Sequence, residues 1–468
     1  MTEEKAIPDK THIPLKRVIG LPAGILLVAG IMIGSGVFKK IAPMAATGLN
    51  ETFIISAWIV AGIITMFGAF IISGLATMTT EAGGVYEYLR LIYGNFLSFL
   101  FGWAAFTILG SASIAALAFI FSQSVNVFLH MTDPLQSLKN ISIANFIYPF
   151  AGLAVKIFAI ASIAVLTWLN CRGTKKGAML NSAVTSAKIL GILMIIVLGF
   201  FSAIPPAMPG ELNPVPITLT GLALFSAFFG AMLSAFWAYD GWVTLSYLSG
   251  EIKDPKRNVP LAIIAGSGLV MLLYVLTNLA YMNVIPLNSF ATLDVNKIAA
   301  AEMVGTLMGR TGTILISLLI MVSTFGALNA IIIAYPRLYY KMAKENFFFK
   351  KVANVHPLFR TPYVALVYSM VWSSVLVITG TFDMLTDMII FAGFLFYGLL
   401  AWGLIKMKRK GVITAKVIGY PVIPIIIILF SVILIINTVM VQPKQSAIGA
   451  VLVLSGVPLY FYFNKKKK

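Results

Sequence analysis

Long apolar stretches separated by short polar segments run along the whole chain. A helix of about 20 apolar residues crosses the hydrocarbon core of a bilayer. Twelve stretches are long enough to do so, near residues 15–45, 51–78, 95–129, 149–170, 178–202, 221–249, 259–284, 311–340, 362–380, 385–407, 418–440 and 446–463. The pattern therefore predicts an all-α integral membrane protein with twelve transmembrane helices in a lipid bilayer.

Composition agrees with this prediction. Of the 468 residues, 59% are hydrophobic and 11% are charged, whereas a soluble domain carries roughly 25% charged residues. Residues 1–16 are polar and have no apolar core, so no cleavable signal peptide is expected. We expect a tail at 1–14, five helices in 15–202, five in 221–408, two more in 418–463, and a basic tail at 464–468.

The net charge of +18 is distributed unevenly among the loops. If the N-terminus is cytoplasmic and each span changes side, most of the 34 basic residues fall in cytoplasmic segments. This asymmetry is the positive-inside rule, and it predicts a multi-pass protein of the plasma membrane (a bacterial inner membrane) with both termini cytoplasmic. Because the basic residues cluster by loop and form no single face, a nucleic-acid partner is not expected.

Residues that could form metal or redox sites are scarce. Cys171 is the only cysteine and is expected in the cytoplasmic loop after span 4, so we expect no disulfide and no disulfide-linked partner subunit. The histidines (His12, His130 and His356) are far apart, and neither a metal site nor a cofactor is expected. An integral-membrane enzyme would need a polar catalytic cluster at membrane depth, and a channel a polar pore stripe. Both remain distant alternatives.

Two predicted spans contain helix-breaking motifs. Gly34-Ser35-Gly36 interrupts span 1, and Ala238-Tyr239-Asp240-Gly241 interrupts span 6. Either motif alone could serve small-residue helix packing. Because they lie five spans apart, they occupy corresponding positions in two halves of opposite orientation, which is typical of inverted-repeat transporters with a central binding site.

Four segments make a family resemblance visible. The chain resembles the amino acid–polyamine–organocation superfamily, most of all its L-type amino acid transporters and their bacterial relatives, in GIMIGSGVF (30–38), EAGGVYEYL (81–89), AFWAYDGW (235–242) with GEIKDPKRNVPLAI (250–263), and the segment 323–362. The resemblance implies a five-plus-five inverted-repeat, leucine-transporter-like fold with two additional C-terminal helices. It also implies alternating access and an amino acid substrate.

The same resemblance assigns roles to the broken helices. It implies that Ser35, Gly36 and Val37, next to Gly34, offer N–H groups and a hydroxyl to the substrate carboxylate, since a helix N-terminus favours an anion. Main-chain carbonyls should receive the amine, from Met32, Ile33, Trp237, Ala238 and Asp240. Trp237 stands where the family has an aromatic outer gate. Ordinary packing is the alternative for Trp237 and Tyr239, and is favoured for Trp242.

Lys188 is a charged residue in the middle of span 5, which is costly in a membrane and indicates function. In related sodium-coupled transporters a cation bridges broken span 1 and a hydroxyl pair on span 8, where this chain has Ser323-Thr324. We expect the Lys188 ammonium to replace that sodium ion and to contact span 1 carbonyls and a span 8 hydroxyl.

Asp240 leaves several alternatives open. Its carboxylate could bind the substrate amine, select cationic side chains, titrate in a proton-coupled cycle, or cap a half-helix, which we favour slightly. Asn329 is either a pocket amide or, as we favour, an interhelical hydrogen-bond partner. Glu251 and Arg337 could form an inner-gate ion pair, although solvated surface charge is the plainer account.

The sequence thus favours a sodium-independent uniporter or exchanger of neutral L-amino acids. A proton-coupled carrier, or one for cationic amino acids or polyamines, is the alternative with the same fold, and Asp240 is its support.

Overall fold

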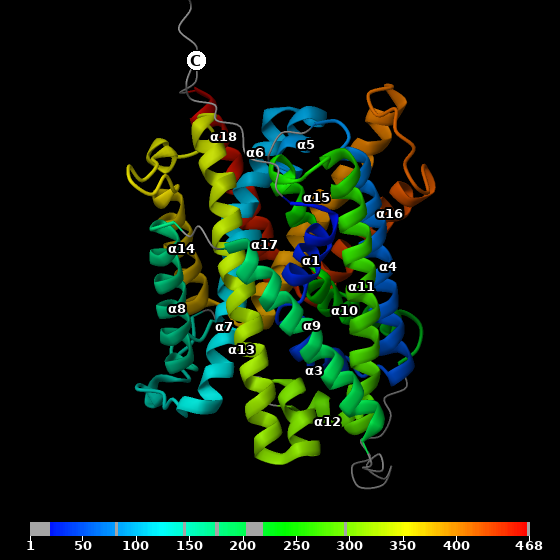
Figure 1. The fold of residues 1–468 in the computed structure, drawn as a ribbon, viewed down its shortest axis with the longest axis vertical. Helices are drawn as coiled ribbons and strands as arrows, with labels where there is room; N and C mark the ends of the chain where they lie inside the picture. The colour runs from blue at the N-terminus through cyan, green and yellow to red at the C-terminus, as the bar shows by residue number, and fades with distance from the viewer. Residues whose placement is uncertain are drawn as a thin grey trace, which may run out of the picture.

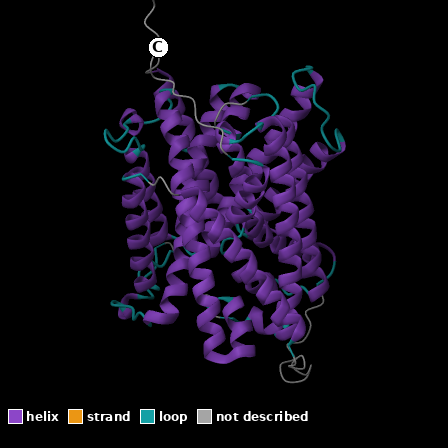
Figure 2. Ribbon diagram, in the orientation of Figure 1, coloured by secondary structure: helices purple, strands orange, loops and turns teal. Residues whose placement is uncertain are grey.

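The computed structural model describes residues 19–79, 83–143, 147–173, 177–202, 219–293 and 297–465, without the side chains of 177–183 and 247–251. Within these ranges the regular structure is helical, apart from two isolated bridges, Ile19–Ile252 and Ile143–Ile147 (Figure 2). The expected tail at 1–14 lies outside the described residues, and so do all but the first two residues of the expected tail at 464–468.

The helices of the first half follow the predicted apolar stretches. They are α1 (Leu21–Met32), α2 (Gly36–Lys39), α3 (Ile41–Ala45), α4 (Glu51–Leu75), α5 (Val85–Tyr93), α6 (Asn95–Ala104), the π-helical η1 (Ala105–Leu109), α7 (Gly110–Leu129), the short η2 (Gln136–Leu138), α8 (Leu153–Cys171) and α9 (Gly177–Phe201). Cys171 is the last residue of α8, so its placement in the following loop was wrong by one residue.

The second half continues the all-helical pattern. Its elements are α10 (Gly221–Tyr239), the 3₁₀ helix η3 (Trp242–Glu251), α11 (Pro255–Val284), α12 (Leu287–Ala291), α13 (Ala299–Lys344), η4 (Lys350–Ala353), α14 (Tyr363–Thr379), α15 (Phe382–Arg409), α16 (Val422–Val441), α17 (Pro443–Leu454) and α18 (Gly456–Lys465). The long α13 is interrupted at Gly309, which has a non-helical conformation. Its first part, residues 299–308, is helical, although the sequence predicted a loop between the spans 259–284 and 311–340.

Eleven helical segments of the described chain are long and apolar enough to cross a membrane. The twelfth predicted span corresponds to α14, which is apolar but has 17 residues. At 1.5 Å per residue that helix is about 25 Å long, a little short of the hydrocarbon core.

The helices form one bundle (Figure 1). Elements α3 and α12 lie at one end, called here the α12 end, and α5 and α18 lie at the other, called the α18 end. Helix α1 lies inside the bundle and packs against α9 and α11, while α7 packs along α13. Large apolar side chains remain exposed on the outer surface, with Phe201 83% and Leu222 71% exposed. Lipid covers such a surface favourably and water does not, so the protein is a multi-pass membrane protein.

Candidate functional site

The first helix break lies between α1 and α2. Helix α1 ends at Met32, and Ile33 has a non-helical ψ of 82°. The N–H of Gly34 turns back to the carbonyl of Met32 at 2.8 Å. Helix α2 starts after Ser35, whose side chain does not cap it and which is 1% exposed. The interruption therefore leaves backbone polar groups in the interior of the bundle that need partners.

The second break follows α10. Asp240 is extended, with φ −65° and ψ 155°, and Gly241 has a φ of +106°, which an L side chain rarely adopts. The Asp240 carboxylate accepts hydrogen bonds from the N–H of Gly241 and from the hydroxyl of Tyr397 on α15. Gly241 precedes η3, and its N–H is not one of the helix N–H groups that an N-cap side chain bonds, so the capping role of Asp240 stays a prediction.

The two breaks pack directly on each other. A Cβ atom on Gly36 would lie 2.3 Å from the Cα of Ala238, and one on Gly241 would lie 2.7 Å from the side chain of Ile31. The indole N–H of Trp237 donates to the hydroxyl of Ser35 at 3.3 Å. The structure therefore brings together the two motifs, although about 200 residues separate them in the sequence.

Lys188 reaches the first break from α9. Its side chain is 2% exposed, and its ammonium donates to the carbonyls of Gly30 and Ile33, each at 2.9 Å. Ser323 on α13 donates to the same Ile33 carbonyl at 3.3 Å. Thr324 instead bonds within its own helix, to Ile320 at 2.7 Å. Lys188 and Ser323 are thus joined through a shared carbonyl, and Thr324 does not take part.

The carbonyl of Met32 also has a protein donor. The hydroxyl of Tyr274 on α11 donates to it at 2.8 Å. Both span 1 carbonyls that were expected to receive an amine, Met32 and Ile33, therefore accept hydrogen bonds from side chains. Sequence reasoning missed Tyr274 because no local motif distinguishes it from the other 16 tyrosines.

The aromatic residues of the second break face different neighbours. Trp237 contacts the ring of Phe382 edge to face at 6.1 Å. Tyr239 donates its hydroxyl to the carbonyl of Trp58 at 3.1 Å and packs against the Trp58 ring. Trp242 packs against Tyr397 at 5.4 Å. Tyr239 thus contributes to helix packing.

Two cavities meet at the second break. One, of about 20 Å³, is lined by residues of α4, α10, α15 and α16 together with Trp242. The other, of about 30 Å³ and called here the inner cavity, is lined by Val85, Phe101, Leu109, Asp240, Gly241, Val243, Thr244, Tyr335, Ile389, Ile390, Gly393 and Tyr397. Asp240, Ile390 and Tyr397 border both, so the Asp240–Tyr397 hydrogen bond lies in the wall between them.

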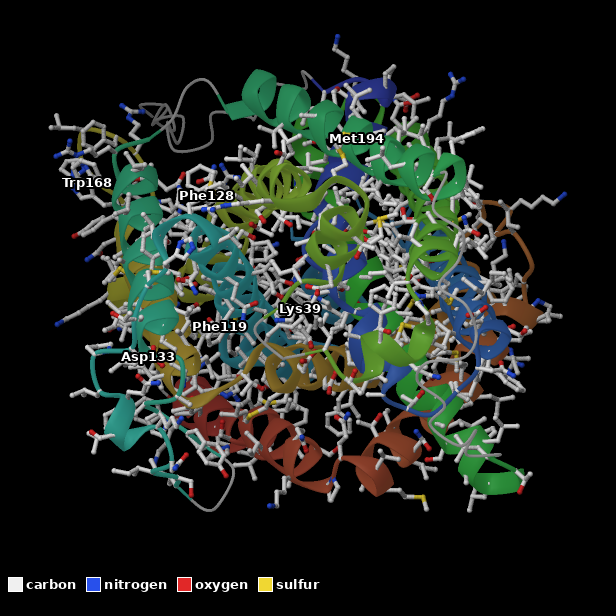
Figure 3. All side chains as sticks on the ribbon, turned by 90° about the horizontal axis from the view of Figure 1, so that it is seen from below. Lys39, Phe119, Phe128, Asp133, Trp168 and Met194 are labelled. Carbon is white, nitrogen blue, oxygen red and sulfur yellow. The ribbon has the colours of Figure 1, made fainter. Side chains whose placement is uncertain are left out.

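A buried cluster of charges lies toward the α12 end from the first break. The ammonium of Lys40, 0% exposed, lies 2.6 Å from Asp383 and 2.8 Å from the hydroxyl of Thr386. Lys39 donates to Gln123 at 2.8 Å, and seen from the α12 end it lies near the middle of the bundle (Figure 3). The sequence analysis did not identify either lysine as part of a buried cluster. The signal available was their apolar context, Gly36 to Met44.

Three further predicted residues have different outcomes. Asn329 accepts a hydrogen bond from Asn170 on α8 at 2.7 Å, so it links two helices. Arg337 is exposed. The side chain of Glu251 lies outside the described residues, and the Glu251–Arg337 pair stays a prediction. Among the described residues, no group of three or more His, Cys, Asp or Glu side chains could hold a metal ion.

Comparison with known proteins agrees with the arrangement. A profile of the family "Amino acid permease" matches residues 19–463. The chain is 31% identical to the serine/threonine exchanger SteT of Bacillus subtilis (strain 168), with 97% of this chain and 98% of that protein covered. It is 29% identical to human b(0,+)-type amino acid transporter 1, with 96% and 88% covered. Identity to human large neutral amino acids transporter small subunit 2 is 27%, with 97% and 82% covered.

An apolar helical bundle with two broken helices in contact at its interior defines a membrane transporter, and the relatives are transporters or exchangers rather than enzymes. The chain belongs to the amino acid permease family, within the amino acid–polyamine–organocation superfamily that its motifs resemble.

Proposed function

We propose that this protein exchanges neutral L-amino acids across the plasma membrane by alternating access, without sodium. Family membership and the names of the relatives support amino acids as the cargo. The observation that carries sodium independence is the Lys188 ammonium, bound at 2.9 Å to two carbonyls beside the first break.

The proposed architecture has twelve spans, with helices 1–5 (15–202) and 6–10 (221–408) as inverted repeats. The two breaks support this reading, because they lie five spans apart and pack on each other. In this arrangement the α18 end, which carries most basic residues, faces the cytoplasm, and the α12 end faces outward.

Recognition of the substrate is divided between the two breaks. The carboxylate binds the N–H groups of Ser35, Gly36 and Val37, at the positive end of a half-helix. The amine binds carbonyls of the second break, from Trp237 to Asp240. Side-chain donors on Met32 and Ile33 support this division, because those carbonyls have less capacity left for an ammonium.

Lys188 supplies a cation in place of sodium. A sodium ion at the same carbonyls would lie within about 4 Å of the ammonium, where like charges repel strongly in a low dielectric. Because this charge is part of α9, it does not cross the membrane down an ion gradient, and sodium therefore supplies no driving force for transport. Ser323, bound to the same carbonyl, supplies the link to α13.

A second candidate is a carrier for cationic amino acids or a proton-coupled carrier. Asp240 favours it, because its carboxylate borders both cavities and could pair with a cationic side chain. The hydrogen bonds from Gly241 and Tyr397 favour a structural role instead, because they already engage the carboxylate within the protein.

Purified protein in liposomes tests the proposal. We expect uptake of labelled serine or leucine to require internal amino acid and to be the same in sodium and potassium media. A panel of unlabelled competitors should show inhibition by neutral amino acids and weak inhibition by arginine and lysine. Uptake that rises with a sodium gradient would contradict the role of Lys188, and dominant competition by arginine would favour the second candidate.

A further inference from the structure

Helix α5 forms part of the wall of the inner cavity. It has nine residues and connects α4 to α6 at the α18 end of the bundle (Figure 1). Its first residue, Val85, lines the inner cavity, which Asp240 also borders. Movement of α5 away from this position would remove a wall on the side nearest the α18 end.

The ends of α5 have backbone conformations suited to hinges. Gly84, just before the helix, has a φ of +51°, and Gly94, just after it, has a φ of +83°. Glycine adopts positive φ without the steric cost that other residues carry, and it moves readily between regions. The helix is thus a short rigid segment between two flexible points.

A buried carboxylate connects α5 to α13. Glu87 is 2% exposed and accepts a hydrogen bond at 3.0 Å from Lys341, at the end of α13. The neighbouring Tyr86 donates its hydroxyl to Glu345 at 2.7 Å. Two contacts from adjacent residues therefore join α5 to the segment that ends α13.

The partners of Glu87 differ in how they are attached. Arg90 lies on α5 itself and bonds the carboxylate at 3.0 Å, so this pair moves as one body. Lys341 lies on α13, and its side chain is 27% exposed, so water can solvate its ammonium when the contact opens. Separation of α5 from α13 leaves Glu87 paired with Arg90, which avoids an unpaired buried charge. The Glu87–Lys341 contact can therefore break and form repeatedly.

The opposite side of α5 is joined to α15. Tyr93 donates to the carbonyl of Leu399 at 2.7 Å, and Lys406 donates to the carbonyl of Ile92 at 3.2 Å. Helix α15 also lines the inner cavity through Tyr397. These bonds attach the C-terminal end of α5, so the N-terminal end at Val85 is the part that can swing.

We propose that α5 is the inner lid of the transport path and that the Glu87–Lys341 pair is its latch, closed in this structure. The proposal rests on the proposed transport function for its purpose. A structural ion pair that merely anchors a loop is the alternative, and it predicts no change in access to the cavity.

Cysteine labelling measures access to the cavity directly. In a Cys171→Ser background, Thr244→Cys places one thiol on the cavity wall. A membrane-impermeant maleimide is added to the α18 side of the protein in inside-out vesicles, without substrate. We expect Lys341→Met to raise the labelling rate at least about fivefold, and Lys341→Arg to leave it near the parent rate. Lys344→Met is the matched control, because Lys344 lies one turn away and contacts the Tyr340 ring.

Cross-linking supplies a second readout. Glu87→Cys and Lys341→Cys are joined by a short bifunctional methanethiosulfonate reagent, which a reductant removes. We expect the cross-link to lower amino acid exchange at least about tenfold, with recovery after reduction. Unchanged labelling in Lys341→Met, or full exchange by the cross-linked protein, would overturn the lid. Wild-type protein that moves no amino acid would contradict the transport function alone, since labelling needs no substrate.

Discussion

The Lys188 ammonium holds the carbonyl of Ile33 at 2.9 Å, and so connects the middle of α9 to the point where α1 breaks. The same nitrogen bonds the Gly30 carbonyl, and both acceptors come from the end of α1 that would otherwise have unpaired carbonyls. One buried charge thus stabilises the unwound backbone. In return, the carbonyl dipoles stabilise the charge in a site with little access to water.

Removal of that charge should disable transport. Lys188→Ala leaves the buried Gly30 carbonyl without its donor, at a cost of roughly 1–3 kcal/mol, and leaves the Ile33 carbonyl with Ser323 alone. We expect exchange in liposomes to fall at least about 100-fold with protein still folded by gel filtration. Added sodium should not restore it, because the alanine site lacks the geometry of a sodium site. Exchange near the wild-type rate would show that Lys188 is dispensable.

The two helix breaks lie so close together that only glycine should fit at position 36. A Cβ there would lie 2.3 Å from the Cα of Ala238, and backbone atoms cannot move aside cheaply. We therefore expect Gly36→Ala to reduce substrate binding by more than about tenfold, measured by equilibrium binding of labelled amino acid. Gly34→Ala is the control, since its Cβ would meet only Leu117 at 3.4 Å. Equal effects of the two would argue against the close contact.

Asp240→Asn separates capping from coupling. An amide oxygen can still accept the hydrogen bonds from Gly241 and Tyr397, so a capping role predicts transport within about threefold of wild type. It also predicts an unchanged dependence of transport on pH. Loss of a pH-dependent component, or loss of cationic competitors only, would instead support the second candidate function.

The Lys40–Asp383 pair should contribute to stability. Lys40 is fully buried but the Asp383 side chain is 38% exposed, so water screens the pair in part and removal of one partner should cost less than the roughly 3–5 kcal/mol of a fully buried pair. We expect Lys40→Met to lower the midpoint of thermal unfolding in detergent clearly. Lys40→Met combined with Asp383→Asn should recover part of the loss. No difference between single and double variants would mean that the charges do not interact at 2.6 Å as the structure shows.

The latch at Glu87 should persist across neutral pH. Burial alone would raise the pKa of Glu87, but hydrogen bonds from Arg90 and Lys341, together with their charges, hold it below its usual value. Because the pKa of Glu87 is lowered in the closed contact, ionisation of Glu87 stabilises that contact fully at pH values above the ordinary pKa of about 4.3. The stabilisation is lost as the pH falls through the lowered pKa. The facing Tyr86 has a pKa raised by burial and by Glu345, so it stays protonated.

We therefore expect Thr244→Cys labelling to be constant between about pH 6 and 8, after correction for thiol ionisation with a model thiol. In Glu87→Gln the rate should be higher at every pH in that range. If the labelling rate of the Thr244→Cys parent, in which Glu87 is intact, changes severalfold over this pH range, another group controls the lid.

Much of the fold could be predicted because its signals are local. Hydropathy over about 20 residues locates spanning helices whatever they pack against, and glycine pairs mark positions where a helix can unwind. The positions of both breaks follow from Gly34-Ser35-Gly36 and from the motif that ends in Gly241. The length of α14 and the helix at residues 299–308 were less predictable, because helix ends depend on packing and capping.

What the sequence by itself determined is the class of molecule, the run of spans, the two breaks and the presence of a charge in span 5. Only the tertiary structure decided which atoms those features meet. Lys188 and Ile33 are 155 residues apart, Glu87 and Lys341 are 254 apart, and Lys40 and Asp383 are 343 apart. Such pairs form when helices pack, and no local propensity encodes them. For the same reason local sequence could not show that Tyr274 bonds the carbonyl of Met32 or that Lys39 and Lys40 are buried.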